Sequence, residues 1–148
     1  PDIPGSMGWD AACPRTCTYA RISTRFGQVL FANTHWDHVG QTARECSGEL
    51  MADVLRREAG DLPIVVVGDF NETYGSPGLK ALSRGLNLNV VSDVSATTYH
   101  NWGDPDERGM AIDHIMASGH LICTYSLVNV LSKGSDHYPL SAMFVRAS

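Results

Sequence analysis

The run Ile-Val-Val-Val-Gly at residues 64–68 is the longest apolar stretch of the chain, and the polar loop residues Asp69, Asn71 and Glu72 follow it directly. A short run of β-branched residues that ends in turn-forming residues predicts a buried strand running into a loop. The run is far shorter than the roughly 18 apolar residues of a membrane-spanning helix. We therefore expect a fold built around a buried strand, without a membrane span.

Strands are predicted on both sides of this segment. Residues 16–23 and 28–35 form two strands around the turn Thr-Arg-Phe-Gly, and residues 90–110 are mostly loop. Three further strands are expected at residues 111–118, 121–131 and 139–147.

Two helices are predicted between the strands. The first covers about residues 42–58, because Thr42 and Glu45 match a capping box and Gly60 is a suitable stop. Its apolar face is expected to consist of Ala43, Cys46, Leu50 and Val54. The second begins at Ser76-Pro77 and stops at Gly85. Strands outnumber helices and one helical crossover is visible, so the fold class is mixed, α+β.

Length and composition indicate one globular domain, or a large part of one, over residues 1–148. The net charge of −5 and the lack of a basic run argue against unaided binding along a nucleic-acid backbone. A phosphate substrate remains compatible with this charge if a metal ion bridges it to the protein. Cys13, Cys17, Cys46 and Cys123 show no paired spacing, which favours free thiols in a reducing compartment such as the cytoplasm; a Cys13–Cys17 disulfide is the alternative.

Titratable and amide side chains collect at the ends of the predicted strands. They are Asn33, His35, Asp69, Asn71, Asp113, Asp136 and His137. Strand residues two apart point to the same side, so two such pairs can face one cleft. Their oxygens suit Mg²⁺ or Mn²⁺, and the histidines suit proton transfer to a phosphate oxygen or from a water. Asp113 lies in an apolar strand, where a carboxylate requires a partner, whereas His114 points to the other side.

Some of these residues also allow other interpretations. Gly-Asp-Phe-Asn and Ser-Asp-His are ordinary turn sequences, and His38 fits a surface or packing role. Residues 33–38 resemble the His-x-His-x-Asp-His motif of dinuclear zinc hydrolases of the metallo-β-lactamase type, with Asn33 at the place of the first histidine. No later histidine lies in the Gly-His-Ser/Thr-x-Gly setting of that fold, so this hypothesis is kept as an alternative.

Five segments in a fixed order resemble the endonuclease/exonuclease/phosphatase superfamily, the DNase I-like proteins. The segments are NTHWDHVG, VVVGDFNETYGSPGLKAL, TYH, AIDHI and SDHYPLSAMF, and GWDAACPRTCTYARI resembles the stretch before them in bacterial-type members. The resemblance implies that His137 is the catalytic histidine and that Asp113 orients it.

The same resemblance implies roles for the other strand-end residues. Asp69 would align or activate the attacking water, with Asn71 as its partner at the phosphate. Asp136 would be a metal-site carboxylate beside Asp69 and Asn71, and His35 a second phosphate-binding histidine. Asn33 ends the same strand and is assigned to substrate binding.

The resemblance further implies part of a four-layer α/β/β/α sandwich, about one sheet with its helices, corresponding to the C-terminal portion of the family domain. The segment that carries the family's principal metal-binding Glu has no counterpart in residues 1–148, and Glu72 is a weak substitute for it. The implied function is Mg²⁺- or Mn²⁺-dependent hydrolysis of phosphodiester or phosphomonoester bonds. The alternative is a non-catalytic half-domain that assembles with another chain or, through an uncovered sheet, with its own copy. The substrate stays open among small molecules, lipid head groups and nucleic acids, because the fold does not decide it.

Overall fold

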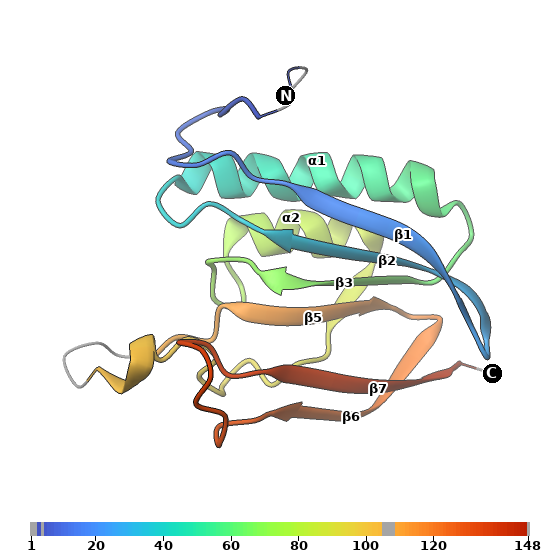
Figure 1. The fold of residues 1–148 in the computed structure, drawn as a ribbon. Helices are drawn as coiled ribbons and strands as arrows, with labels where there is room; N and C mark the ends of the chain where they lie inside the picture. The colour runs from blue at the N-terminus through green and yellow to red at the C-terminus, as the bar shows by residue number, and fades with distance from the viewer. Residues whose placement is uncertain (1–2, 4, 105–108, 148) are drawn as a thin grey trace.

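The computed structural model describes residue 3, residues 5–104 and residues 109–147. Figure 1 shows the order of its elements along the chain. The strands are β1 (Cys17–Thr24), β2 (Gly27–His35), β3 (Ile64–Asp69), β4 (Leu88–Val90), β5 (Asp113–Ser118), β6 (Leu121–Val128) and β7 (Leu140–Arg146). The helices are α1 (Gln41–Ala59) and α2 (Pro77–Leu86), with a 3-10 turn at Asn101–Gly103. The predicted strands and helices are all present, and the short strand β4 is an addition to the prediction.

Five strands form one sheet in the order β1-β2-β3-β5-β4. Strands β2 and β3 are parallel, and the other neighbours in this sheet are antiparallel. A parallel pair needs a long crossover, which α1 supplies. The pairing of β3 with its neighbours places His35 opposite Asp69 on one side and Asp113 opposite Asp69 on the other.

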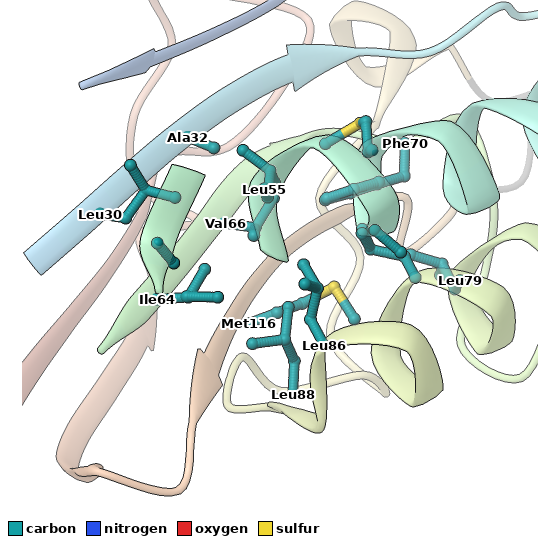
Figure 2. Packing of buried hydrophobic residues seen from close by; sticks show 14 of the residues in the cluster. Leu30, Ala32, Leu55, Ile64, Val66, Phe70, Leu79, Leu86, Leu88 and Met116 are labelled. Atoms are coloured by element: carbon teal, nitrogen blue, oxygen red, sulfur yellow. The ribbon is translucent and has the colours of Figure 1, made fainter. Parts of the chain in front are cut away.

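Both helices pack on the same face of this sheet and enclose the main hydrophobic core (Figures 1 and 2). Leu30, Val66 and Met116 reach this core from neighbouring strands, and Leu55 and Leu82 reach it from α1 and α2. Each of these side chains is almost completely removed from water. Burial of a leucine-sized side chain contributes about 1.5–3 kcal/mol, so this layer is the main source of stability.

The opposite face of the sheet is covered in part by the hairpin of β6 and β7. Val65, Ile115 and Ala117 of the sheet form a second core there, and Ala142 and Phe144 of β7 pack against it. Since side chains alternate along a strand, Asp69 and Asp113 lie on this face, away from the helices.

The start of α1 differs from the sequence prediction. Thr42 and Glu45 do not form a capping box; instead, the carboxylate of Asp10 accepts the backbone N–H of Thr42 at 3.2 Å and of Ala43 at 2.7 Å. The predicted apolar face is also partly wrong, because Leu50 is 42% exposed while Met51, Ala52 and Leu55 are buried. The small residues Ala52 and Gly48 let α2 approach α1 closely, and a helix-wide apolar pattern cannot reveal that contact.

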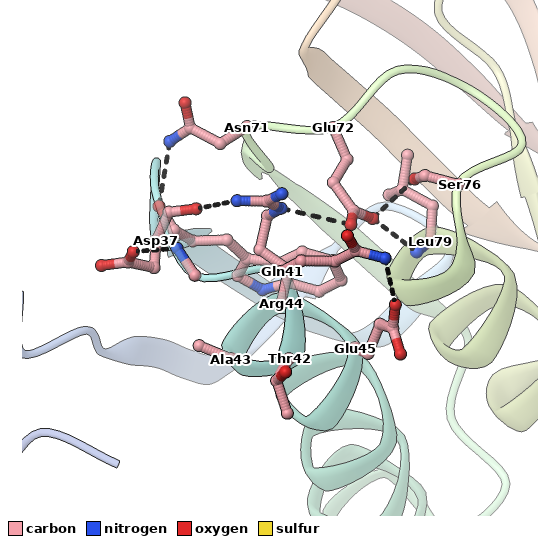
Figure 3. Close-up of polar contacts among 12 residues, drawn as sticks. Asp37, Gln41, Thr42, Ala43, Arg44, Glu45, Asn71, Glu72, Ser76 and Leu79 are labelled. Carbon is pink, nitrogen blue, oxygen red and sulfur yellow. Dashed lines mark hydrogen bonds and ion pairs between the residues drawn. The ribbon is translucent and has the colours of Figure 1, made fainter. Parts of the chain in front are cut away.

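The start of α2 is held by Glu72, which lies between the two helices (Figure 3). Its buried carboxylate pairs with Nε of Arg44 at 3.2 Å and accepts the hydroxyl of Ser76 at 2.5 Å. It also accepts the backbone N–H of Leu79 at 3.2 Å. Ser76 is the N-cap residue, as predicted, but its hydroxyl is used for Glu72 rather than for the helix.

Two further predictions are settled by the described residues. All four cysteines, Cys13, Cys17, Cys46 and Cys123, are free thiols, so the alternative Cys13–Cys17 disulfide is not formed. Neither α1 nor α2 combines the length and apolar character that crossing a bilayer requires.

Candidate active site

The site lies where β2 and β3 end and β5 begins. The register His35–Asp69–Asp113 runs across the three strands, so these side chains meet on the face opposite the helices. The loop before β7 then brings His137 to the same place. Residues separated by up to about a hundred positions in the sequence are thus collected by strand pairing.

Asp113 and His137 form the tightest contact of the site. Nδ1 of His137 lies 2.7 Å from Oδ2 of Asp113, and both side chains are partly buried. The pairing confirms that Asp113, within an apolar strand, has a charged or hydrogen-bonding partner. A carboxylate at Nδ1 keeps the proton on that nitrogen and leaves Nε2 free for chemistry.

Asp69 is the centre of the remaining contacts. Its Oδ2 lies 3.4 Å from Nε2 of His35 and 3.8 Å from Nε2 of His137, and its Oδ1 accepts the backbone N–H of Asn71 at 2.8 Å. Burial raises the pKa of Asp69, and the nearby carboxylate of Asp113 adds to this, while Asn71 and the two histidines oppose it. A carboxylate whose pKa is raised is a better proton acceptor near neutral pH.

Asn71 is held in a fixed position beside Asp69. Its backbone has φ 50°, in the left-handed region that asparagine tolerates better than most residues. Its side-chain amide donates to the carbonyl of Trp36 at 2.9 Å, and Trp36 follows His35. The loops after β2 and β3 are thereby tied together at the site.

Two cavities meet at Asp69 and His137, which line both. One, of about 570 Å³, also contains Asn33 and Asp113. The other, of about 440 Å³, also contains His35 and Asn71. The structure therefore brings most of the predicted residues to one place, but Asn33 and His35 line different cavities and Asp136 lines neither.

Three ligand atoms of Asp69, Asp113 and His137 lie within 4.8 Å of one another. Two carboxylates this close favour a divalent cation between or beside them, because a cation offsets the repulsion between their negative charges. Asp136 is not a member of this group; its carboxylate accepts the hydroxyl of Ser135 at 3.2 Å, and its metal role stays a prediction. The carboxylate of Glu72 is already used by Arg44, Ser76 and the backbone of Leu79, which argues against Glu72 as a substitute metal ligand.

A second group, Cys13, Asp37 and His38, also has its ligand atoms within 4.8 Å. Oδ1 of Asp37 accepts the N–H groups of Val39 and Gly40, and Oδ2 accepts those of Ala12 and Cys13. Burial alone would raise the pKa of Asp37, but these four donors outweigh it and hold the pKa well below its usual range. The carboxylate serves as a brace between two loops.

The guanidinium of Arg15 already contacts two members of this group. Its Nε lies 3.5 Å from Oδ2 of Asp37, and its Nη2 lies 3.0 Å from Nδ1 of His38. A zinc ion at this group would have to displace both contacts. In the metallo-β-lactamase interpretation of residues 33–38, the aspartate and one histidine nitrogen would have to bind zinc, but both already have other partners.

Arg15 and Tyr99 line the cavity of His35 and were not identified from the sequence. Arg15 had a usable signal, since it is the only basic residue among the first twenty and lies in a stretch that resembles the family. The ring of Tyr99 lies 5.0 Å from that of His137, a contact between segments that no local pattern predicts.

Comparison with known proteins identifies the family of this chain. A family model described as the endonuclease/exonuclease/phosphatase family matches residues 2–137. The chain belongs to this family. Its members are hydrolases of phosphoester bonds, including nucleases and phosphatases, and the predicted DNase I-like fold is confirmed. A search of curated proteins found no significant match.

Solved structures of this fold superpose on nearly the whole chain. A mannosyl-6-phosphatase of Bacteroides thetaiotaomicron is 27% identical, with a TM-score of 0.84 over 98% of this chain and 62% of its own. An endonuclease/exonuclease/phosphatase protein of Bacteroides vulgatus is 28% identical, with a TM-score of 0.82 over 99% of this chain and 61% of its own. The beta toxin of Staphylococcus aureus, in a mutant form with bound magnesium ions, shares the fold at 18% identity and a TM-score of 0.62, over 86% of this chain and 57% of its own. The chain thus spans about three fifths of the length of these relatives.

Proposed function

We propose that this chain carries the acid–base half of a metal-dependent phosphoesterase, which hydrolyses phosphodiester or phosphomonoester bonds. The observation that supports this most directly is the contact chain Asp113–His137–Asp69, with the distances 2.7 Å and 3.8 Å. Phosphoester hydrolysis needs a positioned water, a proton acceptor and neutralisation of charge on the phosphoryl oxygens. The family assignment agrees with this chemistry.

In this proposal, His137 acts at the reacting phosphoryl group through Nε2. Asp113 holds Nδ1–H, which fixes the tautomer and stabilises the imidazolium form. The protonated Nε2 can then donate to a phosphoryl oxygen. His35, whose Nε2 also points toward Asp69, contributes a second donor to the phosphoryl group.

Asp69 orients the attacking water and accepts its proton as the new P–O bond forms and the bond to the leaving group breaks. Its raised pKa suits this role. Asn71 positions Asp69 through its backbone N–H and borders the same cavity. Asn33 lines the neighbouring cavity and is assigned to substrate binding there.

Asp69, Asn71 and Asp136 are proposed to hold Mg²⁺ or Mn²⁺, which when bound supplies positive charge to the phosphoryl oxygens. The donor atoms fit, since carboxylate and amide oxygens are hard ligands. In the Staphylococcus aureus beta toxin, magnesium ions are bound by a protein of this fold. The chain covers about 62% of the mannosyl-6-phosphatase, and the family's principal metal-binding Glu has no counterpart in residues 1–148. We therefore propose that tight metal binding depends on residues outside 1–148.

The substrate class is proposed to be a small phosphoester, in keeping with the net charge of −5 and with the sugar-phosphate activity named for the Bacteroides thetaiotaomicron relative. The outer face of the β6–β7 hairpin exposes Tyr125, Leu127 and Met143. We propose that this apolar face is covered by another part of the polypeptide, by another chain or by a second copy. An assembly module without catalysis would share this surface.

The test is a panel of phosphomonoesters and phosphodiesters, assayed with Mg²⁺, with Mn²⁺ and with chelator. It is run on residues 1–148 and on any longer polypeptide that contains them. Metal-dependent hydrolysis that disappears in His137→Ala and persists in His120→Ala supports the proposal, since His120 is an exposed histidine away from the site. Stoichiometric zinc that resists the chelator, or activity that survives His137→Ala, would refute it.

A further inference from the structure

The cavity beside the reaction centre contains two side chains, those of Arg15 and His38, that the proposed mechanism does not use. Its lining includes His35, Asp69, Asn71 and His137, and also Arg15 and His38. Arg15 precedes β1, and His38 lies in the loop between β2 and α1. With a volume of about 440 Å³, the cavity falls in the range of small-molecule sites, about 300–1,000 Å³, and exceeds the needs of one phosphoryl group.

Arg15 is held in place by an ion pair with Asp37. The ion pair of 3.5 Å joins its Nε to a carboxylate that is 1% exposed, while the Arg15 side chain itself is 21% exposed. The same carboxylate accepts the backbone N–H groups of Ala12 and Cys13, both at 3.0 Å, so the segment that carries Arg15 is held as well. A guanidinium ordered before a ligand arrives loses less entropy on binding.

His38 extends the donor surface of Arg15. Nη2 of Arg15 lies 3.0 Å from Nδ1 of His38, and a guanidinium can only donate. Nδ1 therefore accepts, so the ring N–H is on Nε2. Since His38 is exposed, this N–H is available to a ligand together with the remaining guanidinium donors.

Arg15 has a different ion-pair partner from the residues of the reaction centre. Asp69 is approached by Nε2 of His35 and of His137, whereas the ion pair of Arg15 is with Asp37. Arg15 thus lines the same cavity without belonging to the contacts around the reacting group. A cation in this position is suited to a different anionic group of the bound molecule.

We propose that Arg15 and His38 form a second anion-binding subsite, which takes a phosphate group adjacent to the phosphoryl group that is hydrolysed. The substrate would then carry two neighbouring phosphates. This inference deepens the proposed function. It rests on that function only for the claim that the first phosphoryl group is hydrolysed. Arg15 can bind phosphate oxygens in a bidentate manner, which a lysine cannot reproduce.

The experiment measures binding of inorganic pyrophosphate and of inorganic phosphate by calorimetry, with EDTA present and no metal added. The variants are Arg15→Gln, His38→Ala and, as a control with the same loss of charge, Arg57→Gln on the exposed side of α1. We expect the unmodified chain to prefer pyrophosphate, and Arg15→Gln to weaken pyrophosphate binding about tenfold or more while phosphate binding changes little. His38→Ala should weaken pyrophosphate binding in the same direction, and Arg57→Gln should have no effect.

Three results would overturn the subsite: equal affinity of the unmodified chain for both anions, no effect of Arg15→Gln and His38→Ala, or an equal loss for both anions in Arg15→Gln. The last would place Arg15 at the reacting phosphate. If Arg15→Gln does not fold, His38→Ala decides, because it leaves the Arg15–Asp37 pair intact. If neither residues 1–148 nor a longer polypeptide that contains them hydrolyses any phosphoester with metal present, but the Arg15-dependent preference is observed, the proposed function is refuted and the subsite is kept.

Discussion

Nδ1 of His137 lies 2.7 Å from Oδ2 of Asp113, and the two residues are joined although 24 positions separate them in the sequence. Asp113 lies opposite Asp69 in the sheet, so strand register positions the carboxylate, and the loop before β7 brings His137 to it. The imidazole and the carboxylate should therefore work as one unit.

The first prediction tests this unit in a polypeptide that shows activity. His137→Ala and Asp113→Asn should each lower turnover by about 100-fold or more, the scale of positioned acid–base groups. The double variant should lose little more than the worse single variant, because groups that act together are not additive. Single-turnover kinetics on folded variants provide the measurement, and losses that multiply would show that the residues act independently.

The second prediction concerns Thr98, whose hydroxyl holds the start of β5. Its Oγ1 accepts the backbone N–H of Ile112 at 3.1 Å and of Asp113 at 3.0 Å, and its carbonyl accepts the N–H of Tyr138 at 2.7 Å. Thr98 is completely buried and links the segments of Asp113 and His137. We expect Thr98→Val, which keeps the shape, to lower kcat about tenfold or more by displacing Asp113.

Thr98→Ser keeps the hydroxyl and should restore most of that activity. The proton on Nδ1 of His137, observed by NMR, should keep its chemical shift in Thr98→Ser and change it in Thr98→Val. A purely structural role would lower stability in Thr98→Val without moving that signal or kcat, and would contradict the prediction.

The sequence predicted the strands that carry the site because the relevant signals are local. Residues 64–68 are a short β-branched run, and Asp113 is a charge within an apolar strand, so both the elements and the need for a partner could be inferred. Which partner Asp113 takes depends on the register of β3 and β5 and on the loop before β7. The resemblance, rather than spacing, suggested His137.

The failures of the sequence prediction have the same physical origin. Thr42 and Glu45 have the spacing of a capping box, but the helix begins earlier, with Gly40 as its N-cap residue. Asp10, more than thirty residues before Thr42, accepts the N–H groups of Thr42 and Ala43. Leu50 fits an apolar helix face, yet Gly48 and Ala52 are buried in its place, because α2 packs closely against that side of α1. Arg15 was missed although it is the only basic residue among the first twenty, because its position depends on Asp37, whose carboxylate is itself held by four backbone N–H groups.

The third prediction treats Glu72 as a stabilising residue. Its carboxylate is 5% exposed and pairs with Arg44, whose side chain is 15% exposed. Removing one partner of a buried ion pair costs about 3–5 kcal/mol, so Glu72→Gln should lower the free energy of unfolding strongly, toward that range. Urea unfolding is the measurement, and Glu49→Gln on the exposed side of α1 is the control. A stable Glu72→Gln variant with weakened Mg²⁺ binding would show that Glu72 belongs to the metal site after all.

The fourth prediction concerns the outer face of the β6–β7 hairpin. Tyr125 and Met143 are paired across the two strands and are 49% and 62% exposed. Burial of such side chains on association is favourable, so residues 1–148 alone should self-associate or bind an apolar dye. Met143→Lys should reduce this in sedimentation velocity, whereas Val39→Lys, at a residue that is also 62% exposed but lies in the loop before α1, should not. A stable, dye-free monomer would show that the chain closes its own core.

The fifth prediction follows from His114, which points away from the site into the helix-covered core. It is 1% exposed, and its Nε2 lies 2.8 Å from the carbonyl oxygen of Glu72. Burial lowers the pKa of His114, and the hydrogen bond to Glu72 and the carboxylates of Asp113, Asp69 and Glu72 oppose this only in part. The ring is therefore neutral in the folded chain at a pH where the unfolded chain, with a pKa of about 6.5, already binds a proton.

The sign of the effect on stability follows from this difference. Below about pH 6.5 the unfolded state takes up a proton that the folded state refuses, so the free energy of unfolding should fall as the pH decreases from there toward the pKa of the folded state. Above about pH 6.5 both states are neutral at this residue and its contribution is constant. His114→Phe should be less stable at pH 8, because the carbonyl of Glu72 loses its donor, but its stability should depend less on pH between 5 and 7. Urea unfolding of both proteins over this range is the measurement, and parallel pH profiles would show that His114 does not bind a proton on unfolding.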